Sequence, residues 1–575
     1  MCPDLLKTID RYFQTLRYLR PVQIYGRIWF NLKKAKVNAS PAPPRRVVSG
    51  PWIPVATRAP SLLSQRDFLF LNQSGSLSEI GWDGGQREKL WRYNQHYFDD
   101  LNARASAERA TWHLALIEDW IAQNPPGVGV GWEPYPTSLR IVNWVKWALS
   151  GNTLSQAALH SLAVQTRWLC QRLEFHLLGN HLFTNAKALV FAGLFFQGPE
   201  ANGWLKRGTD ILSAEIPEQI LSDGGQFERS PMYHALALED MLDLCNVLSS
   251  FETRNHTGEG EPADVAQGEE FDQSAELLDF KSLCESRIPG MLAWLKTIQH
   301  SDSEISFFND AALGIAPSCA ELEAYASRMG FEVMPISKSS VHLKDSGYCR
   351  LQNASAVVLI DIAPIGPDYL PGHAHADTLS FELSLFSKRV FVNSGTSCYG
   401  SSPERHRQRG TAAHNTVVLN NQDSSEVWGG FRVARRARVQ HARVEQYDEV
   451  LVVQAEHDGY QRLSGSPIHA RRIELSDHEL IVTDTATLSD GKPYKGLAVA
   501  RFHAHPDLKI SLTSRADYSG VIQFSDGKTL SLTVPIAASV RVEPSTWHPR
   551  FGESVENQCL VIELLNGESK LKLSF

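Results

Sequence analysis

The chain has 575 residues, of which 43% are hydrophobic and 21% are charged, and its net charge is −8. This length exceeds what one hydrophobic core usually organises, so two or more domains are expected, and the composition excludes a disordered or fibrous protein. The negative net charge gives the molecule as a whole no electrostatic reason to bind nucleic acid or an anionic membrane.

The cysteines and the first residues bear on the cellular compartment. Eight cysteines are scattered without CxxC pairs, which favours reduced thiols over a disulfide framework. The first 20 residues contain charges throughout and lack the apolar segment of a signal peptide. No stretch approaches the ~18 apolar residues of a transmembrane helix. We therefore expect a cytoplasmic protein without a membrane span, with the periplasm as the alternative.

Residues 1–60 are predicted to form an N-terminal extension. A basic amphipathic helix is expected over 21–36, and the proline-rich stretch 40–46 indicates an extended linker. From 61 to about 335 the apolar residues recur at helical spacing, as in Leu159, Leu162 and Leu169, which predicts a helical domain. Within it, 252–276 has little to bury and is predicted to be a surface loop.

From about 336 to 575 the apolar period changes to two. Segments 356–362, 379–386, 389–393, 450–455 and 480–486 are predicted strands bounded by turn residues. This pattern is typical of an antiparallel β-sandwich. The fold class is therefore multidomain α+β, a helical domain followed by an all-β domain, and the cleft between them is the expected ligand site.

The first segment with chemical potential is 179–185, where Asn180 and His181 interrupt an apolar helical region. The alternative is that these two side chains cap a helix. The second segment, 223–234, displays Glu228, Arg229, Tyr233 and His234 after a glycine turn. Here the alternative is a packed aromatic and a satisfied core histidine.

Two later segments carry histidines. In 371–377, His373 and His375 precede a strand two residues apart and would project to the same face, which suits a metal ligand or a catalytic group. A polar loop with an exposed histidine pair is the alternative. In 413–416, His414 opens the next strand, with Asn393 and Tyr399 on the intervening hairpin, and would complete a metal site with His375.

A local basic cluster is needed for an acidic ligand, because the whole molecule is negative. The candidates lie in 405–409 and at three later positions, and a solvated strand face is the equal alternative. The cluster comprises Arg405, His406, Arg407, Arg409, Arg432, Arg435 and Arg436.

At these residues the chain resembles the heparinase II/III and related alginate lyase group. The stretches "GNHLFTNAKAL", "FERSPMYHAL", "GHAHADTLSFEL" and "HNTV" occur in the family's order, and together they are specific. The resemblance covers about residues 80–450. It implies an (α/α) incomplete toroid over 61–335, followed by a heparinase II/III-like β-sandwich over 336–575. It also implies a polysaccharide lyase that cleaves an acidic, uronate-containing polysaccharide by β-elimination, either glycosaminoglycan-like or an exopolysaccharide.

The resemblance also implies roles for single residues. Asn180 and His181 would neutralise the uronate carboxylate, Tyr233 would act as Brønsted acid and perhaps base, and His373 would be the base or a stabiliser. A structural zinc would be held by His375, by the position of Asn393 and by His414. The family has Asp where this chain has Asn393, and a neutral amide is a poorer zinc ligand than a carboxylate.

The chemistry explains why these residue types are needed. The C5 proton of a uronate becomes acidic only when the adjacent carboxylate is neutralised, after which a base removes that proton and an acid protonates O4. Tyr233 would need its pKa lowered by Arg229 or His234 to act as the base. Other side chains would line the sugar groove, with core packing as the alternative for half of them: Tyr93, Asn94, Trp132, Tyr135, Arg140, Arg229, His234, Tyr399 and Arg409.

Two rival functions remain open. A glycoside hydrolase on the same kind of toroid would use paired carboxylates, for which Glu133, Asp223 and Glu228 are candidates. A non-catalytic glycan-binding or assembly protein of exopolysaccharide biosynthesis is the other. Reducing ends that form without an ultraviolet-absorbing product would favour the hydrolase, and processing that survives loss of Tyr233 and His373 would exclude the catalytic assignment.

Overall fold

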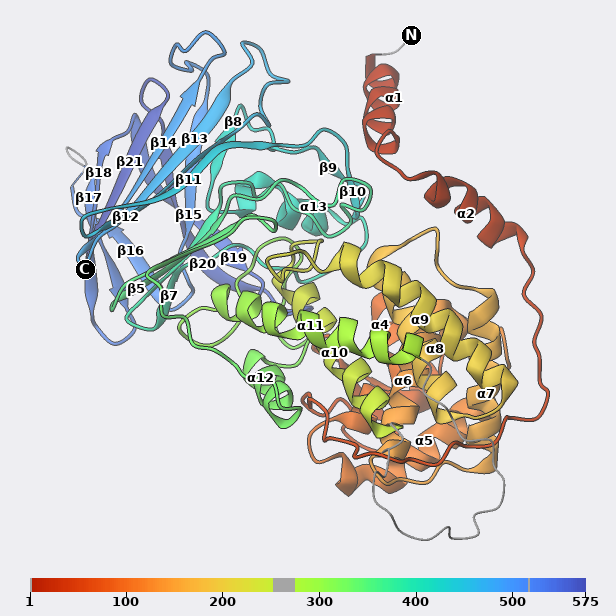
Figure 1. Cartoon of the computed structure of the whole chain (residues 1–575). Coiled ribbons are helices and arrows are strands. Elements are labelled where there is room, and N and C mark those ends of the chain that lie inside the picture. The colour runs from red at the N-terminus through yellow and green to blue at the C-terminus, as the bar shows by residue number, and fades with distance from the viewer. Residues whose placement is uncertain (1–2, 252–274, 515–517) are drawn as a thin grey trace.

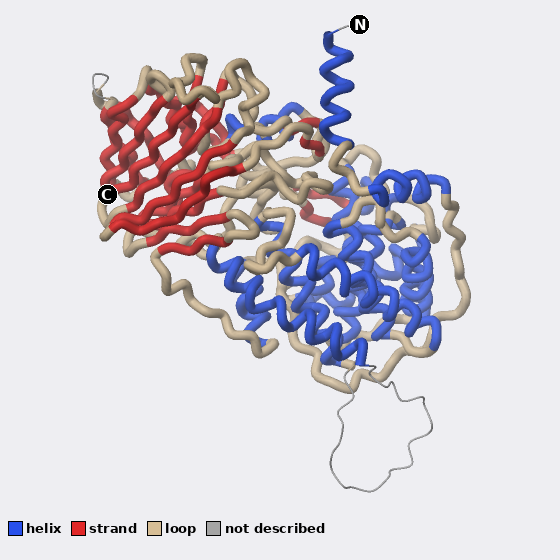
Figure 2. The backbone as a smooth tube through the Cα atoms, turned by 45° about the horizontal axis from the view of Figure 1, so that its top comes forward, coloured by secondary structure: helices blue, strands red, loops and turns tan. Residues whose placement is uncertain are grey.

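The computed structural model describes residues 3–251, 275–514 and 518–575. Helices gather in one part of the molecule and strands in another, and the N-terminal segment runs along the outside of both (Figure 1). Figure 2 separates the two parts by secondary structure. The surface loop predicted over 252–276 falls outside the described ranges except for its last two residues, which belong to a helix.

The N-terminal arm, residues 3–36, holds two helices. These are α1 (Pro3–Leu16) and α2 (Pro21–Leu32). Pro21 occupies the first turn of α2, where its missing N–H costs nothing. The helix predicted over 21–36 ends at Leu32, because Lys33 adopts an extended conformation. The proline-rich stretch that follows is extended, as predicted, and Arg45 forms an isolated bridge with Phe196.

The helical domain opens with a short hairpin and continues as helices. The hairpin is β1 (Asp67–Phe70) and β2 (Gln73–Ser76). The α-helices are α3 (Leu77–Ile80), α4 (Lys89–Tyr97), α5 (Ala110–Gln123), α6 (Pro134–Leu149), α7 (Gln156–Gln171), α8 (Gly179–Phe195), α9 (Pro199–Gln219), α10 (Pro231–Ser250), α11 (Ala275–Thr297) and α12 (Cys319–Arg328). Short 3-10 turns lie at η1 (Asp99–Asn102), η2 (Ser106–Arg109) and η3 (Val130–Trp132).

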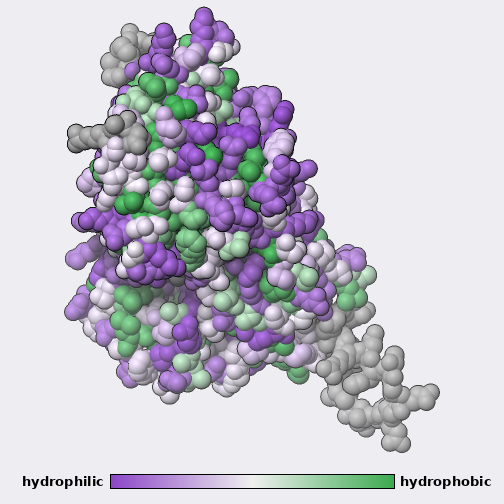
Figure 3. All heavy atoms as spheres, turned by 90° about the vertical axis from the view of Figure 1, so that its left-hand side faces the viewer, coloured by the Kyte–Doolittle hydropathy of each residue, from purple (hydrophilic) through white to green (hydrophobic). Residues whose placement is uncertain are grey.

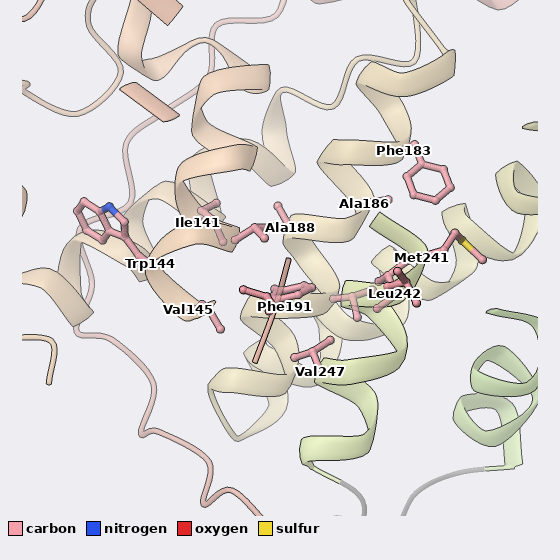
Figure 4. Packing of buried hydrophobic residues seen from close by; sticks show 14 of the residues in the cluster. Ile141, Trp144, Val145, Phe183, Ala186, Ala188, Phe191, Met241, Leu242 and Val247 are labelled. Atoms are coloured by element: carbon pink, nitrogen blue, oxygen red, sulfur yellow. The ribbon is translucent and has the colours of Figure 1, made fainter. Parts of the chain in front are cut away.

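Helix α8 is the centre of the helical core. It is buried on nearly all sides because α6, α7, α9 and α10 pack around it. Figure 4 shows Phe191 of α8 between Val145 of α6 and Val247 of α10. Full burial of such a side chain contributes roughly 1.5–3 kcal/mol. This packing holds the start of α8, and the residues it carries, in a fixed position.

The C-terminal domain is built from antiparallel sheets. Its five-stranded sheet has the order β3 (Ser340–Leu343), β4 (Tyr348–Gln352), β5 (Ala356–Asp361), β6 (Phe381–Leu385) and β7 (Lys388–Phe391). An eight-stranded sheet has the order β11 (Val439–Tyr447), β12 (Val450–His457), β13 (Ile468–Leu475), β14 (Glu479–Thr487), β21 (Glu568–Ser574), β18 (Thr529–Ile536), β17 (Ser519–Phe524) and β16 (Leu508–Leu512). A four-stranded sheet has the order β19 (Ser539–Trp547), β20 (Val555–Glu563), β15 (Ala498–His503) and β8 (Val417–Leu419).

Alternation of buried and exposed residues explains the sandwich. Strands β13 and β14 bury every second side chain, and the apolar ones among these join a core contributed by all three sheets. On the outer side of this domain, turned to the viewer in Figure 3, hydrophilic residues cover most of the surface and hydrophobic ones are scattered among them. The predicted order, helices first and an antiparallel β-domain second, is confirmed.

Long connections of the β-domain reach the helices. The loop between β5 and β6 carries His373, and the segment between β7 and β8 carries the remaining short elements, α13 (Pro403–Arg409) and η4 (Thr411–Ala413). The small hairpin β9 (Val427–Trp428) and β10 (Arg432–Val433) follows β8. Buried polar contacts hold the helical domain and the β-domain together along their interface, called the seam below. His300 Nε2 lies 2.7 Å from Glu382, and Trp294 donates to Ser346 at 2.8 Å. None of the helices in the described ranges is long and apolar enough to cross a membrane.

Candidate active site

A cleft of about 1590 Å³ lies between the helical domain and the β-domain. Both domains line it, the helical one with Asn180 and Tyr233 and the β-domain with His373 and Tyr399. All four of these side chains are partly exposed. The four residues expected to be catalytic, Asn180, His181, Tyr233 and His373, are thus brought together at one cleft.

His373 is held by a buried carboxylate. Its Nδ1 lies 2.9 Å from Asp310 Oδ2, and the backbone N–H of Asp310 donates to the carbonyl of His373 at 2.9 Å. Burial opposes ionisation of Asp310, but the charge of Arg405 and the hydrogen bonds from Arg405 and the two histidines together outweigh it and hold the pKa of this carboxyl well below its usual range. An ionised carboxylate only accepts hydrogen bonds, so Nδ1 carries the proton and Nε2 of neutral His373 is left as a proton acceptor.

Tyr233 stacks on His373 and meets a second tyrosine. The Tyr233 and His373 rings lie 3.9 Å apart, and the Tyr233 hydroxyl is 3.0 Å from that of Tyr399. Burial raises the pKa of both phenols well above their usual value. Both are therefore protonated near neutral pH and suited to donate a proton. The condition for Tyr233 to act as a base, a pKa lowered by Arg229 or His234, is therefore not met.

At the start of α8 two side chains face the cleft. Gly179 has a φ of +54°, and a Cβ there would lie 2.3 Å from Leu370, so only glycine lets the helix begin at this point. No side-chain cap is formed at this helix start, so the capping interpretation of Asn180 and His181 is wrong. His181 Nδ1 lies 3.1 Å from Glu174. Burial opposes protonation of His181, but the charge and hydrogen bond of Glu174, together with the charge of Glu228, outweigh it and raise the pKa.

Glu228 lies beneath these groups. It is 2% exposed, and its Oε2 is 3.7 Å from His373 Nε2. Burial raises its pKa, while His373 and the backbone N–H of Asn180 favour its ionised form. Glu228 therefore links the two halves of the site.

Two expected substrate contacts of the second motif turn away from the cleft. His234 is fully buried, where Nδ1 accepts from the backbone N–H of Gln226 at 3.2 Å and Nε2 lies 3.0 Å from the carbonyl of Met291. Burial lowers its pKa to about 3. Arg229 donates to the carbonyl of Pro364 at 3.0 Å and lies outside the cleft lining. The alternative of a satisfied core histidine is correct for His234.

Three further expected groove residues are internal. Trp132 donates to the carbonyl of Asn124 at 3.1 Å. Arg140 is fully buried between backbone carbonyls, and Arg409 donates both Nε and Nη2 to Ala374. Local sequence patterns do not reveal which way such side chains point. Tyr93, Asn94, Tyr135 and Tyr399 do line the cleft.

The residues of the arginine cluster differ in their partners and in whether they reach the cleft. Arg405 forms a bidentate ion pair with Asp310, with 2.7 Å between Nη2 and Oδ2, and is fully buried. Arg407 pairs with Glu404, and Arg435 pairs with Asp10 and Glu426. Only Arg432 and Arg436 of this cluster line the cleft. The cluster is therefore neither a basic patch nor a solvated strand face.

The expected metal ligands His375 and His414 are buried together with Asp377, which closes the His-x-His-x-Asp pattern of 371–377 but was not expected to be a ligand. His375 Nδ1 lies 3.3 Å from His414 Nε2, and Asp377 completes a group whose ligand atoms all lie within 4.8 Å. His414 Nδ1 is buried without a hydrogen-bond partner among the described residues. Asn393 instead accepts a hydrogen bond from the backbone N–H of Asn415 at 3.0 Å. Two imidazoles and a carboxylate fit a zinc ion, and the nitrogen spacing matches a tetrahedral edge.

The central residue that sequence reasoning missed is Asp310. Its carboxylate binds His373, His375 and Arg405, and Thr396 donates to it at 3.2 Å. Asn309 and Asp310 interrupt the apolar run 305–312, which was the only available signal. Glu174, the partner of His181, was missed as well, because nothing in its neighbourhood distinguishes it.

Comparison with known proteins places this site in context. Residues 87–267 match the family model of the heparinase II/III N-terminus, and residues 335–571 match that of the heparinase II/III-like C-terminal domain. A heparin-sulfate lyase of Bacteroides stercoris is 26% identical over 388 residues, covering 64% of this chain and 52% of the relative. One of Pedobacter heparinus is 24% identical over 373 residues, covering 60% and 53%. The chain spans about half the length of these curated relatives.

Solved structures agree on the fold. A structure of heparinase III superposes with a TM-score of 0.62 at 16% identity, covering 86% of this chain and 76% of the other. A heparan sulfate lyase from Pedobacter heparinus gives 0.54 at 17% identity, covering 85% and 77%. The predicted incomplete toroid followed by a β-sandwich is therefore confirmed.

Proposed function

Because this chain belongs to the heparinase II/III family, we propose that it is a polysaccharide lyase that cleaves a uronate-containing glycosaminoglycan by β-elimination. The observation that carries the proposal is the stack of Tyr233 on a His373 whose Nδ1 is fixed by Asp310. A proton donor and a proton acceptor stand in contact at a cleft wide enough for a sugar chain. An exopolysaccharide containing uronate is the alternative substrate.

The first step is neutralisation of the uronate carboxylate. Asn180 and His181 lie side by side at the start of α8, where an amide donor and an imidazolium stabilise the negative charge that grows on the carboxylate. Glu174 keeps His181 protonated to a higher pH than an isolated imidazole. The charge on His181 is therefore retained to a higher pH than it would be without Glu174.

The tautomer of His373 and the protonated hydroxyl of Tyr233 assign one proton transfer to each of these residues. His373 Nε2 removes the C5 proton, and the imidazolium that forms is stabilised by Asp310. Tyr233 protonates O4 of the departing sugar and is reprotonated from solvent through Tyr399, whose hydroxyl lies 3.0 Å from its own, while His373 Nε2 releases the C5 proton to solvent. Each positioned proton transfer contributes roughly a hundredfold to ten-thousandfold in rate.

The hydrolase alternative has less support. Of the three carboxylates it would use, only Glu228 lines the cleft. Glu133 pairs with Lys89 and Tyr93, and Asp223 accepts from the backbone of Asp345 and Ser346. A paired arrangement across a glycosidic bond is therefore not built from these residues.

A zinc ion, if bound, would be held by His375, His414 and Asp377, in place of the set with Asn393. Such an ion would join the loop that carries His373 to the start of β8, which is a structural role. His375 Nε2 already binds Asp310 at 2.8 Å, so the ligand set supports the same carboxylate that orients His373.

The proposal is tested by digestion of heparan sulfate and of other uronate polymers. A 4,5-unsaturated end that absorbs in the ultraviolet is expected, and Tyr233→Phe and His373→Ala should each lower kcat at least a hundredfold. Phe431→Leu, a change in the same cleft wall without a proton to transfer, is the matched control and should retain most of kcat. Reducing ends without ultraviolet absorbance, or full activity in both variants, would contradict the proposal.

A further inference from the structure

The outer face of α2 is an apolar stripe. Ile24, Ile28 and Leu32 are 51%, 58% and 71% exposed, and they are spaced four residues apart, so they lie on one side of the helix. Tyr25 and Trp29 lie beside them at 61% and 66%. Large side chains exposed in a row on one helix are unusual on a soluble surface and mark an interaction site.

The opposite face of α2 is fixed to the body of the protein. Gly26 packs so closely on His176 that an added Cβ would lie 3.3 Å from the histidine Cβ. Gln23 donates to the carbonyl of Tyr369 at 3.0 Å, and Arg172 donates to the carbonyl of Phe30 at 2.8 Å. The stripe therefore faces outward in a defined orientation.

Helix α1 repeats the pattern. Ile9, Phe13 and Leu16 are 53%, 62% and 51% exposed and share one face. The helix is tied to the β-domain hairpin, where Trp428 donates to Thr15 at 3.1 Å. In Figure 1 both helices run along the outside of the molecule, away from the sandwich core.

The charge of the chain is segregated toward this arm. The first 36 residues carry eight Lys or Arg and two Asp, a net charge of +6, whereas the rest of the chain carries −14. Within the part of the chain that the structure describes, Arg27, Lys33, Lys34 and Lys36 form no salt bridge, so their charge is not neutralised locally. The overall charge of −8 conceals this asymmetry.

We propose that the outer face of α2, with α1 beside it, docks the protein on an anionic lipid surface. With twelve residues, α2 is about 18 Å long, too short to cross a hydrocarbon core of about 30 Å, so it lies in the plane of the interface. The apolar stripe enters the acyl boundary, Trp29 and Tyr25 sit at headgroup level, and the lysines after Leu32 contact the lipid phosphates.

The composition of the face distinguishes lipid from a protein partner. Lysine is depleted in protein–protein interfaces, whereas it flanks the apolar stripe here. Aliphatic and aromatic side chains next to unpaired lysines are the composition of an interfacial helix. Because Leu16, Leu19, Gln23 and Arg27 of the arm also line the cleft, docking would hold the cleft next to the membrane.

The test is co-sedimentation of the full chain with vesicles of phosphatidylcholine alone and with one quarter phosphatidylglycerol. We expect binding to the anionic vesicles that weakens with salt. The double variant I28S/W29S should lower the partition coefficient at least tenfold. K33Q/K34Q/K36Q should lower it on the order of a hundredfold, since each lysine near such a surface contributes about 1 kcal/mol.

Matched controls use exposed residues elsewhere. V47S/M334S removes apolar side chains that are 82% and 66% exposed. K338Q/K495Q/K509Q removes three exposed lysines that form no salt bridge with the described residues. Both variants should bind the vesicles as the parent does. Thermal melting confirms that each variant is folded. The readout needs no catalysis, so the result is independent of the lyase assignment.

Three results would overturn the proposal. The first is no sedimentation with anionic vesicles at low salt. The second is equal binding by the arm variants and their controls. The third is a dimer, detected by light scattering, that I28S/W29S abolishes while the parent fails to bind vesicles, which would assign the face to a second copy of the chain.

Discussion

Single residues set the protonation states on which the proposed reaction depends. Asp310 determines which nitrogen of His373 is free to accept a proton. Glu174 extends the pH range in which His181 is charged, and burial keeps Tyr233 protonated. None of these three effects requires the substrate to be present. The site is therefore prepared as an acid, a base and a cation before a sugar chain enters.

Replacing Glu174 by Gln should change the pH dependence of substrate binding. Glu174 raises the pKa of His181, so the imidazolium is present below that pKa and is lost as the pH rises through it. In E174Q the alkaline rise in KM should shift to lower pH, with about a tenfold higher KM near neutral pH and little change at pH 5. Initial rates measured by ultraviolet absorbance across the pH range provide the readout.

The control for this experiment is E285Q on the exposed surface of α11, which should leave the profile unchanged. A change in kcat with an unshifted KM profile would show that Glu174 does not act through His181.

The proposed reacting groups were easier to find in the sequence than the residues that support them. Tyr233 and His373 lie in motifs dense in polar residues, so the sequence marks them as candidates. The strands β13 and β14 could be predicted because their alternation of buried and exposed residues is also a local pattern. Asp310 lies 63 residues before His373, and only the fold brings them together. Arg409 was misplaced because the direction of a buried side chain depends on tertiary contacts and not on its neighbours in sequence.

Among the helices, a buried charge network ties four elements together. Asp243 of α10 accepts from Lys146 of α6 at 2.9 Å, from Lys187 of α8 at 2.7 Å and from Tyr325 of α12 at 3.1 Å. Burial opposes its ionisation, but the two lysines outweigh this and lower its pKa. The network lies at the cleft floor, where it sets the spacing of the helices that carry Asn180 and Tyr233.

Asp243→Asn should destabilise the protein by about 3 kcal/mol, because it leaves two buried lysines short of one negative charge. Denaturant unfolding at pH 7 measures the change. Asp279→Asn, on the exposed side of α11, makes the same substitution and should stay within about 0.5 kcal/mol. Because the folded pKa of Asp243 is lowered from 3.8 to about 2, its contribution should be fully present above the ordinary carboxyl range and should be lost as the pH falls from about 4 to about 2. Equal stability of the two variants at pH 7 would contradict this account.

The loop before β6 and the start of β8 are the elements that zinc would join. We expect close to one zinc per chain by elemental analysis after reconstitution, and a clear loss in Asp377→Asn and His414→Gln. Asn393→Asp should not raise the stoichiometry, because that side chain already accepts a backbone N–H. Removal by a chelator should lower Tm if the ion is structural. Stoichiometric zinc in Asp377→Asn would exclude that residue as a ligand.

At the scale of the whole molecule, the two domains share buried polar contacts along their seam. Arg350 donates to the carbonyl of Gln299 at 2.6 Å, and His300 binds Glu382 and Ser384, each at 2.7 Å. Separation of the domains would leave these groups without partners, which costs about 1–3 kcal/mol for each. The seam therefore couples the domains energetically.

We expect calorimetry to show one cooperative unfolding transition for both domains. Glu382→Gln, which removes the charge facing His300 and Arg389, should split or broaden that transition. Glu449→Gln, in the exposed turn between β11 and β12, should leave it single. Two transitions in the parent chain would mean that the seam does not couple the domains.

The contact between the hydroxyls of Tyr233 and Tyr399 has one more consequence, because each partner belongs to a different domain. A shift of the domains by little more than an ångström breaks it while leaving each half of the site intact. A small molecule that binds between the two domains, outside the cleft, and shifts them apart would thus inhibit the enzyme without competing with the polysaccharide. The value of kcat then depends on the relative position of the two domains. Inhibitors of this kind should lower kcat and leave KM nearly unchanged.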